Sequence, residues 1–378
     1  MKITLLASDE ATAPLYRVRA LARLLQRRFE VEVLGFVSQA EAVDPVAPRD
    51  FPYRAIVARC GRGFAASAQA MREAITGDLV YAMKPRPTSY GVALAHRAAT
   101  GCPVVVDVDD WELFMIHPWS RFTLKNMAYA LGRLDDPNNY LATWALDRRV
   151  READGVTAVS RFFQQRYGGL LAPHYVDTAL FDPARHDGAA TRAAHGLEDQ
   201  RVVVFAGIAH PGKGVAAILE ALRALGPGAP AWRLVIVGPA TPYARAIAAS
   251  DARVVLVGTQ PPTRTPAFLA MADLVVLPQR PTPVAVGQMP MKLFEAMAMG
   301  VPVVATALSD IPEVLTGCGR VVPPDDPGAL RGAIAELLAE PAAARALGRR
   351  ARARVVERHS WEVGAAVIGD YLAARVGG

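Results

Sequence analysis

Short apolar segments alternate with helical patterns along this chain, and the alternation stops once near the middle and then restarts. Strands that are separated by helices form a parallel sheet with helices on its faces. The expected strands are residues 3–7, 31–36, 53–58, 79–83, 104–108 and 156–159 in the first half, and 201–206, 234–237, 254–257, 274–277, 301–305 and 320–322 in the second. This rhythm predicts an α/β protein with two doubly wound, Rossmann-like sheets.

The break in the rhythm follows Asp177, where a stretch rich in Asp, Ala and Arg continues to Gln200. A chain of 378 residues exceeds what one core usually supports, so two domains are expected. Helices are predicted at the end of the chain, over residues 327–339, 341–357 and 361–374. Two such sheets that face each other create a cleft, and their ligands bind beyond the carboxyl ends of the strands.

The charge and the cysteines exclude several classes of protein. The first 178 residues carry 22 Lys and Arg against 19 Asp and Glu, and the remainder carries 20 against 17, so each half is +3. Without a basic tail or basic residues interleaved with aromatic ones, no nucleic-acid partner is expected. The apolar runs are too short for a bilayer span, the N-terminus enters directly as a strand, and the cysteines are isolated, which together predict a cytoplasmic protein.

One helical pattern carries an arginine stripe, formed by Arg19, Arg23 and Arg27 beside apolar residues. Such a helix could touch an anionic membrane surface, or its stripe could simply be the solvated face of a helix that packs on the core. Peripheral contact with the inner membrane surface is therefore one of two interpretations.

The segment 287–306, GQMPMKLFEAMAMGVPVVAT, places the carboxylate of Glu295 among apolar residues shortly after Pro290. Proline suits the first turn of a helix, and residues 301–305 read as a buried strand. Backbone N–H groups at such a helix start can bind a diphosphate, and a carboxylate one turn further can accept hydrogen bonds from ribose hydroxyls. The candidate donor-binding residues of this segment are Gly287, Gln288, Met289, Met291, Lys292, Leu293 and Glu295.

A second candidate site is the glycine-rich loop 207–214, GIAHPGKG, which follows a predicted strand and opens a helix. Its N–H groups, at Gly207 and Gly212 among others, and the ammonium of Lys213 could hold a diphosphate leaving group. His210 is a weaker candidate in the same loop.

Segment 287–306 resembles the donor-binding signature of family 4 glycosyltransferases with the two-domain GT-B fold, in which E-x7-E precedes A-M-A-x-G-x-P-V-V-A. Glu295 stands at the second glutamate and Gly287 replaces the first, so the segment is similar to the P-x-K-L-F-E variant. The loop 207–214 is similar to the family's G-R-x-x-x-x-K-G, with Ile208 in place of the arginine. Further similarity covers nearly the whole chain, as in ADGVTAVS at 153–160 and VDTALFDP at 176–183.

The resemblance implies two domains facing across a cleft. The N-terminal domain, residues 1–178, would hold the acceptor, and the C-terminal domain, residues 179–359, would bind a nucleotide sugar, while a terminal helix at 360–378 packs back on the first domain. It also implies a retaining transfer of a hexose from a nucleotide diphosphate sugar to a hydroxyl acceptor, which could be a glycan, a glycolipid or a small molecule. Lys213 and Lys292 would stabilise the leaving group. No cofactor and no metal ion are implied.

Acidic residues end a strand of the first half in PVVVDVDD, residues 103–110. By register Asp109 stands where many relatives carry a catalytic histidine, and a carboxylate beside another, here Asp110, has a raised pKa and can accept a proton. Acids at strand ends are also common caps, so both interpretations stay open. The loop at 8–14 lacks the family's paired glycines, and Arg17 is the candidate substitute for their phosphate contact.

Two other functions compete with this interpretation. Residues 61–66, GRGFAA, satisfy G-x-G-x-x-A, which is typical of a dinucleotide site beginning at Gly61 and Gly63, but the next strand is followed by Lys84 and carries no carboxylate for a ribose. An NAD(P)-dependent oxidoreductase is thus the lesser alternative. A catalytically degenerate GT-B module that binds a nucleotide is the other, because the arginine and the first glutamate are missing. The aromatic segment 111–144 could shape an acceptor pocket or a lipid-facing surface, or it could simply be part of the packing between helices.

Overall fold

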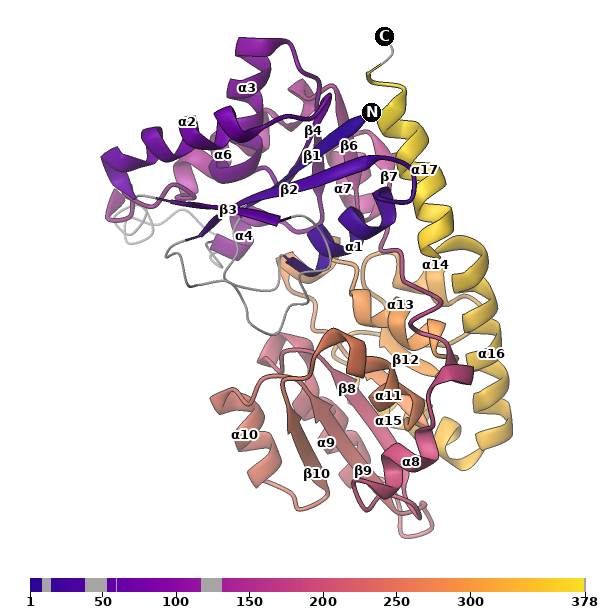
Figure 1. The fold of residues 1–378 in the computed structure, drawn as a ribbon. Coiled ribbons are helices and arrows are strands. Elements are labelled where there is room, and N and C mark those ends of the chain that lie inside the picture. Colours follow the sequence, from indigo (N-terminus) through magenta and orange to yellow (C-terminus); the bar gives the residue numbers. More distant parts are fainter. Residues whose placement is uncertain (9–14, 38–52, 59, 117–130, 377–378) are drawn as a thin grey trace. The chain divides into compact units, whose positions relative to one another are not determined.

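The computed structural model describes residues 1–8, 15–37, 53–58, 60–116 and 131–376. The chain divides into two compact units, one made of Met1–Pro173 with Glu362–Gly378 and the other of His174–Trp361. Figure 1 shows the elements of both units. We describe each unit by itself, as unit 1 and unit 2.

Unit 1 contains a parallel sheet of seven strands in the order β3-β2-β1-β4-β5-β6-β7. Its strands are β1 (Lys2–Ala7), β2 (Glu30–Val37), β3 (Tyr53–Val57), β4 (Leu79–Met83), β5 (Val104–Val108), β6 (Gly155–Ala158) and β7 (Leu170–Leu171). Its helices are α1 (Leu15–Leu25), α2 (Phe64–Ala74), α3 (Val92–Thr100), α4 (Glu112–Ile116), α6 (Tyr140–Arg148) and α7 (Arg161–Tyr167). Every residue of β4 and β5 is buried, which explains why both strands are apolar except for Asp107.

The terminal helix α17 (Trp361–Ala373) packs on the first half of unit 1. The Tyr371 hydroxyl accepts a hydrogen bond of 3.0 Å from the backbone N–H of Val156, and Arg28 donates to the Ala365 carbonyl at 3.1 Å. Arg27, one residue of the arginine stripe on α1, forms an ion pair of 2.8 Å with Glu362. This part of the stripe is therefore used inside the unit. No helix of the described ranges has the length and apolar character needed to cross a bilayer.

Unit 2 contains a parallel sheet of six strands in the order β10-β9-β8-β11-β12-β13. Its strands are β8 (Arg201–Ala206), β9 (Trp232–Val237), β10 (Val254–Gly258), β11 (Leu274–Leu277), β12 (Val303–Thr306) and β13 (Arg320–Val322). Its helices are α8 (Gly188–Ala193), α9 (Val215–Arg223), α10 (Pro242–Ala249), α11 (Thr265–Ala270), α12 (Pro283–Gly287), α13 (Met291–Ala298), α14 (Ile311–Leu315), α15 (Pro327–Ala339) and α16 (Pro341–Arg358). Alternate residues of β8 pack with α9 and α15 in one core.

The predicted elements and the observed ones differ at a few ends. Strand β7 was not predicted, because two residues carry too little pattern to be recognised. Strand β12 begins at Val303 instead of Val301, since the N–H of Val301 bonds to the Ala296 carbonyl at the end of α13 and Pro302 has no N–H to donate. The predicted fold class of two doubly wound parallel sheets is confirmed.

Both sheets reverse their strand order between two neighbouring strands, β1 and β4 in unit 1 and β8 and β11 in unit 2. Ligands of open α/β sheets bind beyond the carboxyl ends of the strands at this point. The loops that follow β4 and β8 therefore lie where a ligand is expected, whereas Gly61–Gly63 follows the edge strand β3. A dinucleotide site at these glycines is not favoured, because the order of the strands places them away from the reversal.

Candidate functional site

The glycine-rich loop after β8 depends on two glycines that hold the backbone in unusual positions. Gly207 has a φ of +127° and Gly214 a φ of +71°, a region that L residues with a side chain rarely adopt. A Cβ on Gly214 would lie 2.0 Å from the carbonyl oxygen of Pro278. The loops after β8 and β11 therefore approach each other backbone to backbone, and no other residue type fits at Gly214.

Lys213 ends a short turn in this loop, η5 (Pro211–Lys213). The Nδ1 of His210 accepts a hydrogen bond of 3.1 Å from the N–H of Gly212, which forms the turn. The ammonium of Lys213 donates to the side-chain oxygen of Gln288, and the N–H of Arg280 donates to the Gly212 carbonyl at 3.0 Å. His210 thus shapes the turn, while Lys213 links the loop to the start of the segment around α13.

Lys292 lies in the first turn of α13, and its side chain extends toward the glycine-rich loop. Its Nζ is 4.2 Å from the centroid of the Phe205 ring and 2.7 Å from the position of a Cβ on Gly207. Burial, with the repulsion of Lys213 added to it, lowers the pKa of Lys292 to about 7, although Glu295 acts in the opposite direction. Two ammonium groups therefore converge at the carboxyl end of β8, an arrangement that suits a multiply charged anion.

Glu295 follows Lys292 by three residues and lies on the same side of α13. Burial raises the pKa of Glu295 to about 7, and the charge of Lys292 only partly offsets this. Among the described residues its carboxylate has no hydrogen bond to the protein, so both oxygens are available to a ligand. Two of the remaining candidates in this segment, Met289 and Leu293, have side chains that are buried in the core. The side chains of Gln288 and Met291 are partly exposed.

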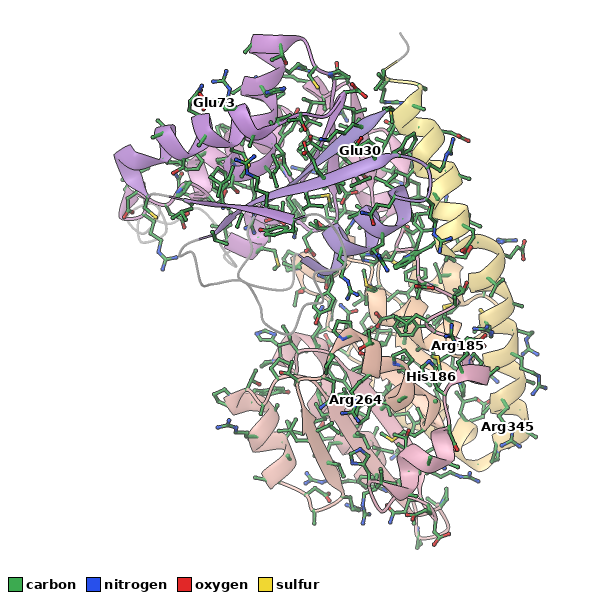
Figure 2. The ribbon with its side chains drawn as sticks, in the orientation of Figure 1. Glu30, Glu73, Arg185, His186, Arg264 and Arg345 are labelled. Atoms are coloured by element: carbon green, nitrogen blue, oxygen red, sulfur yellow. The ribbon has the colours of Figure 1, made fainter. Side chains whose placement is uncertain are left out.

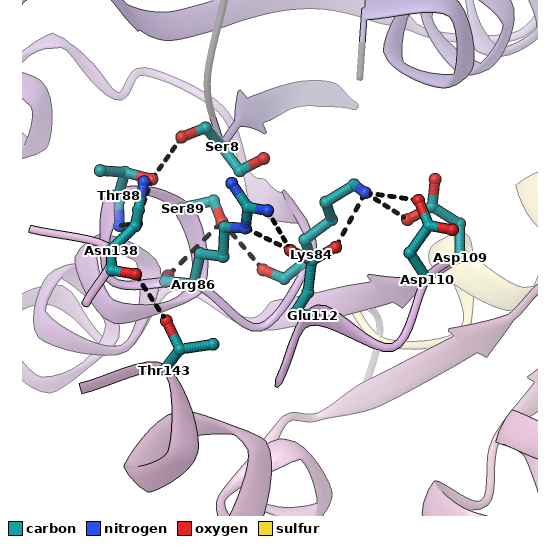
Figure 3. A network of polar contacts seen from close by, with 10 residues as sticks. All are labelled: Ser8, Lys84, Arg86, Thr88, Ser89, Asp109, Asp110, Glu112, Asn138 and Thr143. Atoms are coloured by element: carbon teal, nitrogen blue, oxygen red, sulfur yellow. Dashed lines mark hydrogen bonds and ion pairs between the residues drawn. The ribbon is translucent and has the colours of Figure 1, made fainter. Parts of the chain in front are cut away.

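Unit 1 presents a different group of charged residues after β4 and β5, drawn in Figure 3. The ammonium of Lys84 is buried and lies 2.8 Å from Asp110, 2.8 Å from Glu112 and 3.4 Å from Asp109. Arg86 forms an ion pair with the other oxygen of Glu112. Lys84 has a φ of +69°, a strained conformation for a residue with a side chain. The three carboxylates are close enough to one another for a metal ion, but the lysine ammonium already lies among them.

Asp109 is the acid of this cluster with the weakest bonding. One of its oxygens, Oδ1, is buried without a hydrogen bond and has only the 3.4 Å ion pair with Lys84. Burial raises the pKa of Asp109 to about 7, Lys84 counteracts this, and Asp110 adds to it. A carboxylate with such a pKa can accept a proton near neutral pH.

Arg17, the candidate for a contact with the donor phosphate, lies in the interior of unit 1. Its guanidinium is buried and donates to both oxygens of Asp107, at 2.6 and 2.8 Å, and to the carbonyl of Ala172 at 3.0 Å. Burial opposes the charge, but Asp107 raises the pKa of Arg17 above its ordinary value. The hydroxyls of Tyr81 and Thr157 also donate to Asp107, so this ion pair is part of the core.

Lys84, Arg86 and Glu112 were missed as site residues in the sequence. In the sequence, Lys84 and Arg86 closely follow the apolar run of β4. Two cationic residues that closely follow one strand, next to a strand that ends in acidic residues, are the pattern that indicates this cluster. Part of the aromatic segment 111–144, residues 117–130, lies outside the described residues, as does most of the loop at 8–14.

Residues 200–340, which include the glycine-rich loop and α13, match the family described as Glycosyl transferases group 1. A curated relative from Mycolicibacterium smegmatis, a GDP-mannose-dependent alpha-(1-6)-phosphatidylinositol monomannoside mannosyltransferase, is 34% identical over 62% of this chain and 66% of its own length. A D-inositol 3-phosphate glycosyltransferase from Segniliparus rotundus is 32% identical over 55% of this chain and 47% of its own length. The chain thus matches less than two thirds of the length of these relatives.

Solved structures show the same fold over nearly the whole chain. Sucrose-phosphate synthase from Thermosynechococcus elongatus has a TM-score of 0.76 and 21% identity, with 99% of this chain and 98% of that chain covered. Anabaena HepE, solved in complex with UDP-glucose, has a TM-score of 0.74 and 19% identity, with 99% and 100% covered. These structures show the GT-B fold, and the family match over residues 200–340 supports the resemblance to glycosyltransferases, while the P-x-K-L-F-E variant stays a prediction.

Proposed function

We propose that this chain, a GT-B glycosyltransferase by its group 1 domain and its fold, moves a hexose from a nucleotide diphosphate sugar to a hydroxyl acceptor with retention of configuration. The observation that carries the proposal is the convergence of Lys213 and Lys292 with an unbonded carboxylate, Glu295, at the strand-order reversal of unit 2. Two cations suit a diphosphate, and a carboxylate one turn away suits a ribose.

The leaving group is the part of the reaction that these residues would assist. As the bond between the sugar and the diphosphate breaks, negative charge grows on the phosphate oxygens, and cationic donors fixed at that place lower the barrier. Lys213 and Lys292 would act in this way together with N–H groups of the loop at Gly207 and Gly212. The proposal needs no metal ion, because the two lysines supply the positive charge.

Lys292 would change its charge when the donor binds. Its pKa of about 7 leaves it partly neutral in the free protein, and a bound diphosphate would raise that pKa and keep the ammonium charged. The repulsion between Lys213 and Lys292 would then be replaced by attraction of both to the ligand. Glu295 would bind the two ribose hydroxyls at the other end of the same turn of α13.

Retention of configuration enters the proposal from the resemblance to family 4 glycosyltransferases, and the proposed mechanism needs no protein nucleophile. The acceptor hydroxyl would attack from the face that the diphosphate leaves, and the departing diphosphate would balance the positive charge that develops on the sugar. Asp109 would take the proton of the acceptor hydroxyl, while Asp110 stays bound to Lys84 at 2.8 Å. The assignment of Asp109 rests on its surroundings within unit 1.

The names of relatives support a nucleotide sugar as the donor but differ in the base. The relative from Mycolicibacterium smegmatis is named as GDP-mannose-dependent, and HepE was solved with UDP-glucose. We therefore propose the donor class and leave the base to experiment. Peripheral membrane contact through the arginine stripe stays a prediction, as does the cytoplasmic location.

A screen of GDP-, UDP- and ADP-sugars by thermal shift tests the donor, because a ligand at a hundred times its Kd stabilises by about 2.7 kcal/mol. The donor found in the screen is then used with Glu295→Ala, and with Glu220→Ala on the exposed side of α9 as the matched control. Glu295→Ala should lose roughly 2 to 4 kcal/mol of transition-state stabilisation and remain folded.

Two results would contradict the proposal. A folded Glu295→Ala protein that binds every nucleotide as the wild type does would remove Glu295 from the donor site. A nucleotide sugar that binds but is neither hydrolysed nor transferred, whatever hydroxyl acceptor is offered, would favour the degenerate nucleotide-binding module.

A further inference from the structure

A cavity of about 390 Å³ lies at the edge of the unit 2 sheet opposite the glycine-rich loop. Its lining includes Arg201, which begins β8, Asp273, which directly precedes β11, and Pro302, which directly precedes β12. The cavity is therefore at the amino ends of these strands, whereas Lys213 and Lys292 lie at the carboxyl ends. A ligand bound here would be separate from the proposed donor.

The charged residues of the cavity are three arginines and one acid. Arg192 comes from α8, Arg201 from β8 and Arg345 from the early turns of α16, and Asp273 is the acid. Arg192 is held in place, since it donates to Asp273 at 2.9 Å and to the carbonyl of Met271 at 2.8 Å. One carboxylate neutralises one guanidinium, so the lining keeps an excess of two positive charges.

The other two arginines have unused donors. Among the residues that the structure describes, the guanidinium of Arg201 has one ion pair, of 3.6 Å with Asp273, which is longer than a hydrogen bond. Arg345 is exposed on α16 (Figure 2), and within the described part of the chain its guanidinium has no hydrogen bond or ion pair. Guanidinium groups bind phosphate through two parallel N–H donors, and both residues can still supply them.

The remaining lining residues include Met299, Val301, Leu337 and Leu338, which are only 2–4% exposed, so little apolar surface faces the cavity. The volume falls within the range of pockets that bind small molecules and exceeds what an inorganic anion needs. Two guanidinium groups in a cavity of this size suit an organic molecule that carries a phosphate.

We propose that this cavity binds a small organic phosphate, with Arg201 and Arg345 on the phosphate and the remaining volume of the cavity around the carbon part. The site is independent of the proposed function, because none of its residues belongs to the donor candidates. It lies beside the C-terminal end of α13, at Met299, so the helix that carries Lys292 and Glu295 runs from one site to the other.

The test is isothermal titration of sn-glycerol 3-phosphate into the full chain at low ionic strength. Arg201→Ala and Arg345→Ala should each weaken binding roughly ten- to hundredfold, since each removes charge-assisted hydrogen bonds. Lys213→Ala should bind the probe as the wild type does. Arg349→Ala, an exposed arginine on the same helix, is the matched control and should also bind normally.

Three outcomes would overturn the proposal: no binding to the wild type at millimolar probe, equal loss in Arg349→Ala and Arg345→Ala, or loss in Lys213→Ala with none in the cavity variants. The last would place the phosphate in the glycine-rich loop. Because Arg345 is exposed, its replacement should not unfold the protein, so a loss of binding there reports on the site. Glycerol without phosphate should not bind.

Discussion

The Nζ of Lys292 occupies the space that a side chain on Gly207 would need, since a Cβ there would lie 2.7 Å from it. The glycine directly follows β8 and the lysine lies in the first turn of α13, 85 positions further along the sequence. Because Gly207 has no side chain, the ammonium of Lys292 can lie against it.

Gly207→Ala should displace Lys292 and lower kcat for transfer, because the added methyl group takes the place of the ammonium. The φ of +127° adds backbone strain of about 1 to 3 kcal/mol. Gly196→Ala is the matched control, since Gly196 also has a positive φ, +64°, but open space around its Cβ. Steady-state kinetics and thermal unfolding of both variants separate the two effects. Equal kcat in the two variants would show that transfer does not depend on the position of Lys292 beside Gly207.

Lys213→Ala should reduce kcat by about a hundred- to a thousandfold and change the donor KM much less, because the lysine acts on charge that develops during bond breaking. Lys292→Ala should show a smaller loss of the same kind, and the double variant should lose less than the sum. Arg264→Ala, at an exposed position of unit 2, serves as the control. Near-normal kcat in Lys213→Ala would show that the loop 207–214 does not bind the diphosphate.

The stability of unit 2 should depend on pH through Glu295 and Lys292. The folded-state pKa of Glu295 is raised from 4.5 to about 7, so the folded state holds more protons in that window and stability falls as pH rises through it. The pKa of Lys292 is lowered from 10.5 to about 7, so the unfolded state holds more protons above pH 7 and stability rises there.

Differences in Tm isolate these two contributions. The Tm of Glu295→Gln should rise relative to the Tm of the wild type as pH rises from 5 to 7. The Tm of Lys292→Met should fall relative to the Tm of the wild type as pH rises from 7 to 10. A difference between variant and wild type that is constant with pH would argue against the shifted pKa of that residue.

If Asp109 accepts the acceptor proton, it must be ionised, so kcat/KM should fall as pH falls below about 7. Lys84→Met should move the acid limb of the kcat/KM profile to higher pH, because the ammonium of Lys84 lowers the pKa of Asp109. Asp110→Asn should move it to lower pH, because the neighbouring negative charge raises that pKa. A purely structural role would lower the rate in both variants without moving the limb in opposite directions.

Asp107→Ala should destabilise unit 1 by about 3 to 5 kcal/mol, since it leaves the buried Arg17 guanidinium without its counter-ion. Arg17→Met should cost a similar amount, and the double variant less than the sum. Thermal unfolding measures all three. If Arg17→Met were as stable as the wild type and only the donor KM rose, Arg17 would belong to the phosphate site as first predicted.

The sequence by itself determined the fold class and indicated the candidate donor segments. Period-two and period-3.6 patterns are local, so the strands of both sheets could be read residue by residue, and β7 escaped because it is two residues long. Gly207, Lys213 and Glu295 could be singled out for the same reason, since a glycine-rich loop and a carboxylate in an apolar helix are recognisable within one segment.

Only the tertiary structure decided which charged groups meet. Arg17 and Asp107 are 90 residues apart and form a buried ion pair, so a residue predicted to bind phosphate is held within the core. Lys84 lies among three carboxylates of the next strand end, and Lys292 lies against Gly207. Such pairs depend on strand order, register and the direction of long side chains, which no local pattern encodes. The pKa shifts of Asp109, Lys292 and Glu295 follow from that burial.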